Sequence, residues 1–126
     1  MHMPYVSCVG MAWTVQFHPD FEAEFLQLNP AVQIEIIAGV ALLEVVGPGL
    51  KRPHADTLSG SKLKNLKEYR FKADNGVWRM AYAFDPKRKA ILLCGGDKSG
   101  VSKARFYDGL IAKAEERYAQ HLETIK

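Results

Sequence analysis

Several features that define large classes of protein are scarce or absent in this sequence. Its 126 residues include two cysteines, Cys8 and Cys94, too few for a disulfide framework and without the spacing of metal ligands. No apolar run reaches the roughly 18 residues of a membrane span, and no leader peptide or lipid anchor is recognisable. Walker loops, nucleophile elbows and dinucleotide fingerprints are also missing. We therefore expect a cytoplasmic protein without a metal ion or cofactor, away from the membrane, in which Cys94 is a buried small hydrophobe.

Basic residues are missing from the first part of the chain. Residues 1–50 contain five acidic residues and neither Lys nor Arg, which leaves residues 51–126 with a net charge of +8. Between Lys62 and Arg105, twelve basic residues stand against four acidic ones. Such a local excess is typical of a surface that binds a polyanion, although a solvated charged face is the alternative. We favour nucleic acid as the ligand.

The segment from Leu66 to Phe84 is predicted to form a β-hairpin. Aromatic and β-branched residues flank Asp74-Asn75-Gly76, a sequence that supplies the positive φ angles of a tight antiparallel turn. If Lys72 pairs with Val77, Arg70 lies directly opposite Arg79. Alternation then predicts a core face of Tyr69, Phe71, Trp78, Met80, Tyr82 and Phe84, and a second face, outside the core, of Glu68, Arg70, Lys72, Arg79, Ala81 and Ala83.

Two arginines facing each other on a sheet indicate a site for an anion. Like charges directly opposite one another destabilise a sheet, so the pair suggests that space is kept for a ligand, which we take to be phosphate. A guanidinium group binds phosphate with two hydrogen bonds and stays charged at physiological pH. The alternative is that Arg70 and Arg79 are surface arginines compensated by Glu68 and other acids.

The remaining segments predict an α+β fold with one mainly antiparallel sheet. The expected order is a strand, two helices in a hairpin, three strands in a meander and a final helix. The residues assigned to each part are a strand at 13–17, helices from 19 and from 30 to 46, a loop at 50–65, the hairpin, a doubly buried strand at 90–94 and a helix at about 102–122. We expect one domain over residues 11–126, preceded by a poorly ordered leader at residues 1–10.

Further polar residues could bind or cleave RNA. Lys98 follows the last strand in a glycine-rich turn, and Lys103, Arg105 and Tyr107 begin the final helix, where cations hint at a negatively charged ligand. Proton transfer would need a residue such as Glu68, His54 or Tyr107, although His54 is more simply a loop histidine. The predicted catalytic residues are Glu68, Arg70, Arg79, Lys98 and Tyr107, and the predicted RNA-binding residues are His54, Lys64, Lys67, Lys72, Lys103 and Arg105.

Three runs resemble the phage Gp49-like branch of the RelE/ParE toxin superfamily, which includes the HigB-type toxins. They are LKRPHADTLSGSKLKNLKEYRF, GVWRMAYAFDPKRKAILLCGGDKSG and KARFYDGLIAKAEERYAQHL, and the resemblance extends from Trp13 to Leu122. It implies a RelE-like fold, in which an N-terminal strand and helical hairpin pack with the sheet and a C-terminal helix. Many members are ribosome-dependent mRNA endoribonucleases neutralised by a helix-turn-helix antitoxin. The resemblance therefore implies a toxin whose partners are a HigA-like antitoxin, mRNA and the ribosome.

The resemblance also bears on individual residues. The strand arginines of the family fall on Arg70 and Arg79, its basic C-terminal turn on Lys98, and its aromatic residue near Tyr107. Glu68 departs from the pattern, because well-studied RelE-type nucleases have lysine there, so their proton-transfer scheme is not transferred. The superfamily also includes ParE-type toxins that inhibit DNA gyrase. A gyrase inhibitor and an inactive antitoxin-binding module therefore remain as alternatives.

Overall fold

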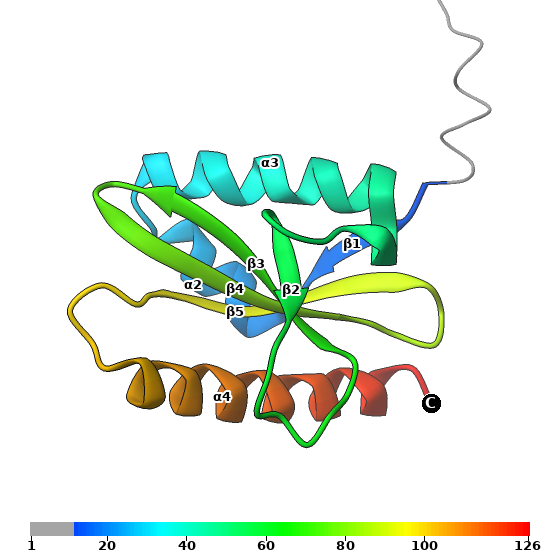
Figure 1. Ribbon diagram of the computed structural model, residues 1–126. Coiled ribbons are helices and arrows are strands. Elements are labelled where there is room, and N and C mark those ends of the chain that lie inside the picture. The colour runs from blue at the N-terminus through cyan, green and yellow to red at the C-terminus, as the bar shows by residue number, and fades with distance from the viewer. Residues whose placement is uncertain (1–11) are drawn as a thin grey trace, which may run out of the picture.

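A five-stranded sheet with helices on both faces forms the frame of the protein (Figure 1). The computed structural model describes residues 12–126, so the predicted leader and Cys8 lie outside the described residues. The strands lie in the order β1-β5-β4-β3-β2, with β1 parallel to β5 and the other neighbours antiparallel. The elements are β1 Thr14–Phe17, α2 Pro19–Leu26, α3 Pro30–Val46, the 3-10 turn η1 Gly47–Gly49, β2 Ala55–Thr57, β3 Leu66–Ala73, β4 Gly76–Phe84, β5 Lys89–Asp97 and α4 Lys103–Thr124.

The β3–β4 hairpin has the predicted register. Lys72 pairs with Val77, and Arg70 lies opposite Arg79. Asp74 and Asn75 both adopt positive φ angles, of 51° and 59°, as the central residues of a primed two-residue turn require. The α+β order, the mainly antiparallel sheet and the burial of Cys94 are likewise confirmed.

The predicted loop at residues 50–65 was wrong in one respect. It contains the short edge strand β2, in which Asp56 pairs with Glu68 of β3. A strand of three residues that follows Pro53 is too short to show an alternating pattern, so no periodic signal in the sequence indicates it. β2 brings the side chain of Asp56 and the preceding residue Arg52 to the side of β3.

The second face of the hairpin is also part of a core, contrary to the sequence-based expectation. Ala81 and Ala83 are fully buried beneath α4, together with Ile91, Leu93 and Ala114. The alanines are small because a helix packs closely over them. Only the part of this face nearer the β3–β4 turn and the edge strand β2 is left open beside α4.

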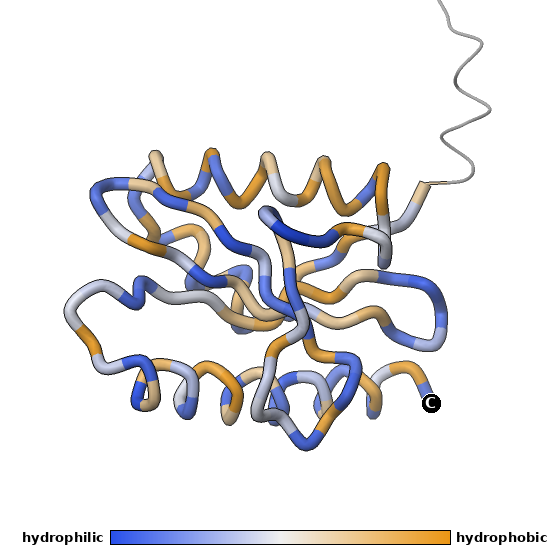
Figure 2. Tube along the Cα trace, viewed as in Figure 1, coloured by the Kyte–Doolittle hydropathy of each residue, from blue (hydrophilic) through white to orange (hydrophobic). Residues whose placement is uncertain are grey.

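The helix α3 is apolar on both sides. Val32, Ile36 and Leu43 are buried against the other face of the sheet, and Gly39 lets the ring of Tyr69 approach, since a Cβ there would lie 2.6 Å from it. The outer side is also largely hydrophobic (Figure 2). By length and composition the 20 residues Pro30–Gly49 could cross a membrane, contrary to the expectation from the sequence, but one side of the helix packs on the sheet.

An ion pair links the two helical layers. Arg117 of α4 donates from Nη1 and Nη2 to the carboxylate of Glu24 in α2, at 2.9 and 2.6 Å, and Nη1 also donates to the carbonyl oxygen of Leu93 at 2.9 Å. The hydrogen bond from Arg117, opposed by desolvation, lowers the pKa of Glu24. Because Arg117 is buried, this contact fixes α4 on the sheet and so sets the position of its first turns.

Replacing Arg117 with methionine should destabilise the protein by about 1–3 kcal/mol, because the buried carbonyl of Leu93 loses its donor. The matched control is Lys113→Met, which removes an exposed cation from the same helix. Urea unfolding measures both. The stability that the ion pair gives is complete above the ordinary glutamate pKa of 4.5 and is lost as pH falls through the lowered pKa of Glu24, so the difference between wild type and Arg117→Met should narrow in acid. Equal stability of the two variants would contradict this role.

Candidate functional site

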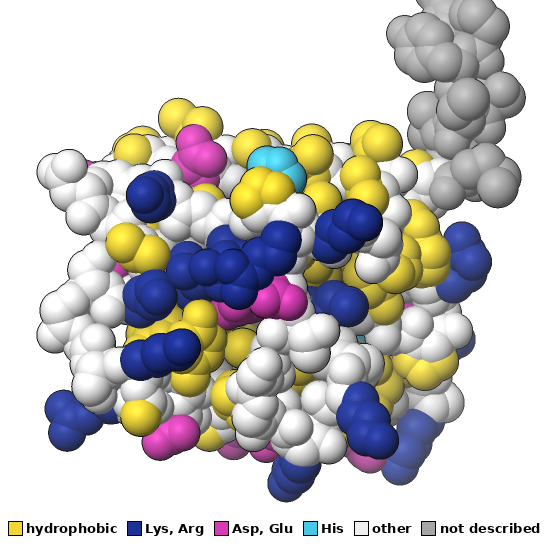
Figure 3. All heavy atoms as spheres, viewed as in Figure 1, with side chains coloured by type: hydrophobic (Ala, Val, Ile, Leu, Met, Phe, Trp, Pro, Cys, Tyr) yellow, Lys and Arg dark blue, Asp and Glu magenta, His cyan; other side chains and the backbone are white. Residues whose placement is uncertain are grey.

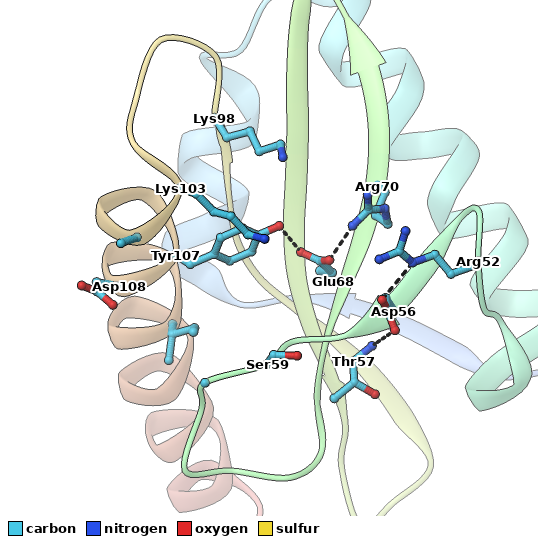
Figure 4. Close-up of a pocket in the computed structure, with 13 residues that line it drawn as sticks. Arg52, Asp56, Thr57, Ser59, Glu68, Arg70, Lys98, Lys103, Tyr107 and Asp108 are labelled. Atoms are coloured by element: carbon cyan, nitrogen blue, oxygen red, sulfur yellow. Dashed lines mark hydrogen bonds and ion pairs between the residues drawn. The ribbon is translucent and has the colours of Figure 1, made fainter.

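A cleft of about 630 Å³ opens between the β2–β3 edge of the sheet and the first turns of α4 (Figure 4). Its basic lining residues are Arg52, Arg70, Lys98 and Lys103, which come from the chain before β2, from β3, from the turn after β5 and from the start of α4. Figure 3 shows Lys and Arg side chains gathered in a band across this face, with acidic side chains beneath them. The cleft is therefore suited to a negatively charged ligand.

The carboxylate of Glu68 forms the floor of the cleft. It accepts a hydrogen bond from Arg70 Nη1 at 2.8 Å on Oε2 and another from the phenol of Tyr107 at 2.7 Å on Oε1. Glu68 is only 5% exposed, so each oxygen needs such a partner. The two bonds join β3 to α4 and fix the direction of the Arg70 guanidinium, whose side chain is 22% exposed.

Arg79 is buried and does not line the cleft. Its Nε donates to Tyr107 Oη at 3.2 Å and its Nη1 donates to the backbone oxygen of Trp78 at 2.9 Å. Glu68 Oε1 lies 3.8 Å from the same Nε, so one carboxylate compensates both arginines. The prediction that both guanidinium groups face the ligand is wrong for Arg79: β4 is flanked by β3 and β5 and covered by α4, whereas β3 lies beside a short edge strand.

Electrostatics distinguish Lys98 and Tyr107 from the other polar residues of the cleft. Partial desolvation and the positive charges of Arg79, Arg70 and Lys103 lower the pKa of Lys98. Burial and the hydrogen bond to Glu68 raise the pKa of Tyr107, so this phenol remains protonated and donates to Glu68. Asp97 shapes the turn that carries Lys98, since its Oδ1 accepts from the backbone N–H groups of Val77 and Ser99.

Of the six predicted RNA-binding residues, Lys103 alone lines the cleft. His54, Lys64, Lys72 and Arg105 are exposed outside it, and Lys67 pairs with Tyr82 on the alternate side of β3. His54 contributes its backbone oxygen, which accepts from the N–H of Arg70 at 2.8 Å. A role for these side chains in binding RNA stays a prediction.

Sequence reasoning missed Arg52 and Asp56. Arg52 Nε donates to Asp56 Oδ2 at 2.9 Å, and this hydrogen bond, with one from the N–H of Thr57, lowers the pKa of Asp56. Asp56 also lies opposite Glu68 in the sheet, so each of these facing carboxylates has its own arginine. The available signal was the spacing of four residues between Arg52 and Asp56 in the basic loop. This spacing points to the cleft only when Asp56 is known to belong to a strand that pairs with β3. Within residues 12–126, no three His, Cys, Asp or Glu side chains are grouped so as to hold a metal ion.

Comparison with known proteins identifies relatives. The model of the family described as phage-derived Gp49-like proteins (DUF891) matches residues 23–119. The candidate toxin HigB3 of Mycobacterium tuberculosis is 42% identical over 99 residues, covering 79% of this chain and 84% of HigB3. The candidate toxin HigB2 of the same organism is 41% identical over 116 residues, covering 91% of this chain and 57% of HigB2. The chain therefore spans little more than half the length of HigB2.

Solved structures show the same fold at low sequence identity. The free Escherichia coli toxin RelE, as an R81A/R83A mutant, aligns with a TM-score of 0.59 at 15% identity, over 85% of this chain and 98% of RelE. The archaeal RelE of a RelE–RelB complex from Pyrococcus horikoshii aligns with a TM-score of 0.52 at 20% identity, over 72% of this chain and all of that chain. The RelE-like fold is thereby confirmed. This chain belongs to the Gp49-like family and is related to the HigB-type proteins.

Proposed function

We propose that this protein is the toxin of a type II toxin–antitoxin pair and inhibits translation by cleaving mRNA. The observation that carries the proposal is the cleft, in which Arg52, Arg70, Lys98 and Lys103 converge. Such a group of cations is suited to the RNA backbone, because Arg and Lys side chains contact nucleic acids mostly at the phosphate oxygens. Family membership supports the assignment, since HigB3 and HigB2 are candidate toxins and the RelE of similar fold is a toxin.

In the proposed reaction, the RNA supplies its own nucleophile. The 2′-oxygen forms a bond to the neighbouring phosphorus, its proton passes to a solvent water molecule, and the bond from phosphorus to the 5′-oxygen of the next nucleotide breaks. Arg70 and Lys98 bind the phosphate oxygens as negative charge grows on them. Lys98 also protonates the leaving 5′-oxygen, a role that its lowered pKa favours. These steps require no metal ion.

Glu68, Tyr107 and Arg79 act as positioning residues in this scheme. Both oxygens of Glu68 already accept hydrogen bonds, from Arg70 and from Tyr107, which makes the carboxylate a poor acceptor for the proton of the 2′-hydroxyl. Arg79 in turn donates to the Tyr107 oxygen. Together they hold Arg70 in place before RNA binds, so its side chain loses less conformational entropy when the complex forms.

The proposed partners are the translating ribosome, which presents the mRNA, and a cognate helix-turn-helix antitoxin of the HigA type. A partner protein is supported by the Pyrococcus structure of similar fold, which is a complex of RelE with RelB. A DNA gyrase inhibitor or an inactive antitoxin-binding module would share the fold without using the cleft for RNA.

The central test adds the full chain to purified translating ribosomes and maps the mRNA ends. The buffer contains EDTA to bind other metal ions and an excess of Mg²⁺ to keep the ribosomes intact. Wild type should cut the message, and Arg70→Ala should reduce the rate at least about a hundredfold, because a donor to the reacting phosphate is lost. Lys87→Ala, which removes an exposed cation from the β4–β5 turn, should leave the rate unchanged. Inhibition of translation with intact mRNA would refute the nuclease proposal. Inhibition of DNA supercoiling by purified gyrase, measured separately, would select gyrase as the target.

The rate should depend on the protonation of Lys98. Desolvation and neighbouring positive charges lower the pKa of Lys98 below the ordinary 10.5. The lysine therefore loses its proton, and the enzyme its activity, at a lower pH than a free lysine would. Single-turnover cleavage by ribosome complexes should fall as pH rises through that pKa. Lys98→Arg should cleave more slowly but without the alkaline decline, since arginine keeps its proton. The same decline in both proteins would assign it to another group.

Tyr107→Phe should weaken both the fold and the reaction. Removing the phenol leaves the buried Glu68 carboxylate without one partner, which should lower the free energy of unfolding by about 1–3 kcal/mol. Cleavage should fall about tenfold at saturating ribosomes, because Arg70 is less well fixed. Tyr118→Phe is the matched control, since its phenol donates to a neutral backbone oxygen of Phe84 at 3.3 Å. If both variants lose equal stability and neither loses activity, Tyr107 has no positioning role.

A further inference from the structure

The outward side of α3 carries an apolar stripe that packs against nothing in residues 12–126. Ile34, Ile37 and Val45 are 66%, 51% and 80% exposed, and the exposed residues Ala38 and Ala41 lie between them. Spacings of three, four, seven and eleven residues put these five on one side of a helix. We call them the outer stripe. They belong to the exposed side of α3, whose tube is orange over much of its length in Figure 2.

A helix that only covers a sheet does not need this stripe. The inner side of α3, with Val32, Ile36 and Leu43, already supplies the core, and the solvent side of such a helix is normally charged or polar. Among the described residues, five of the six large hydrophobic side chains that are most exposed belong to α2 and α3: Leu26, Ile34, Ile37, Val45 and Val46. Apolar side chains concentrated in this way mark an interaction surface.

Charge selects the kind of partner. Residues 12–50 contain no Lys or Arg and five acidic residues, of which Glu24 is paired with Arg117. The two in α3 are Glu35 and the exposed Glu44, and Glu44 borders the outer stripe beside Ala41. An anionic membrane surface would be repelled by this excess of acid. A second copy of the chain would bring two acidic surfaces together. A segment with basic residues beside its own apolar side is attracted instead.

We propose that the outer stripe is the docking surface for a basic amphipathic helix of a partner protein. Ile34, Ile37 and Val45 would anchor the apolar side of that helix, and the small side chains of Ala38 and Ala41 would allow close approach of the two helix backbones. Glu44 would pair with a basic residue at the rim. The cleft lies on the α4 side of the sheet, so a partner bound here leaves it open (Figure 1). This inference does not depend on RNA cleavage.

The test uses two labelled synthetic peptides of about five turns, long enough to match α3. Both have the same Leu and Ile side, flanked by Lys and Arg in one peptide and by Glu in the other. Fluorescence anisotropy measures binding to the full chain, and amide NMR shifts locate it. The basic peptide should bind on α3. Ala41→Arg should lower its affinity at least about tenfold, because the variant places a large cation in the contact. Ala119→Arg, at an exposed position of α4, is the matched control.

Reversing the rim charge separates this proposal from general hydrophobic adhesion. Glu44→Lys should lower the affinity for the basic peptide about two- to fivefold and raise the affinity for the acidic one. The proposal is overturned if neither peptide binds, if both bind equally, or if Ala41→Arg has no more effect than Ala119→Arg. Self-association that Ala41→Arg abolishes would assign the stripe to a second copy. Binding only after removal of residues 1–10 would assign it to the N-terminal segment of this chain. Either result would also overturn the proposal. All of these measurements are independent of cleavage activity.

Discussion

The site depends on one buried carboxylate. Glu68 lies under the cleft with 5% of its surface exposed, and a carboxylate in such a place is stable only when its oxygens are hydrogen-bonded. Arg70 and Tyr107 supply those bonds from β3 and α4. The requirement therefore fixes the direction of Arg70 and the position of the first turns of α4 together. It also explains how two arginines tolerate facing positions, since Glu68 lies near Arg79 as well.

The distribution of charge divides the molecule into two working surfaces. The helical hairpin of α2 and α3 has all of its formal charges negative, whereas the α4 side of the sheet carries the basic cleft. An RNA strand is attracted to the second surface and repelled from the first. A basic protein segment has the opposite preference. The segregation already visible in the sequence thus separates the surface proposed for nucleic acid from the surface proposed for a partner protein, with the sheet between them.

The sequence predicted the parts of the fold that follow from local pattern. Asp74-Asn75-Gly76 fixed the hairpin register, and the register put Arg70 opposite Arg79. Alternation along a strand tells which side a residue faces, but not what covers that side. For this reason the burial of Arg79, and of Ala81 and Ala83 under α4, could not be predicted. β2 was missed because three residues show no period, and with it the contribution of Arg52 to the cleft.

The most direct measurement is a structure of the full chain on a ribosome whose mRNA is blocked by 2′-O-methyl groups, so that the uncut message stays bound. One mRNA phosphate should lie within hydrogen-bond distance of Arg70 and Lys98 in the cleft, with Arg79 still held by Tyr107 and the Trp78 carbonyl. An mRNA whose phosphates pass outside the cleft, or contact Arg79 and leave Arg70 bound only to Glu68, would contradict the proposed role of the cleft.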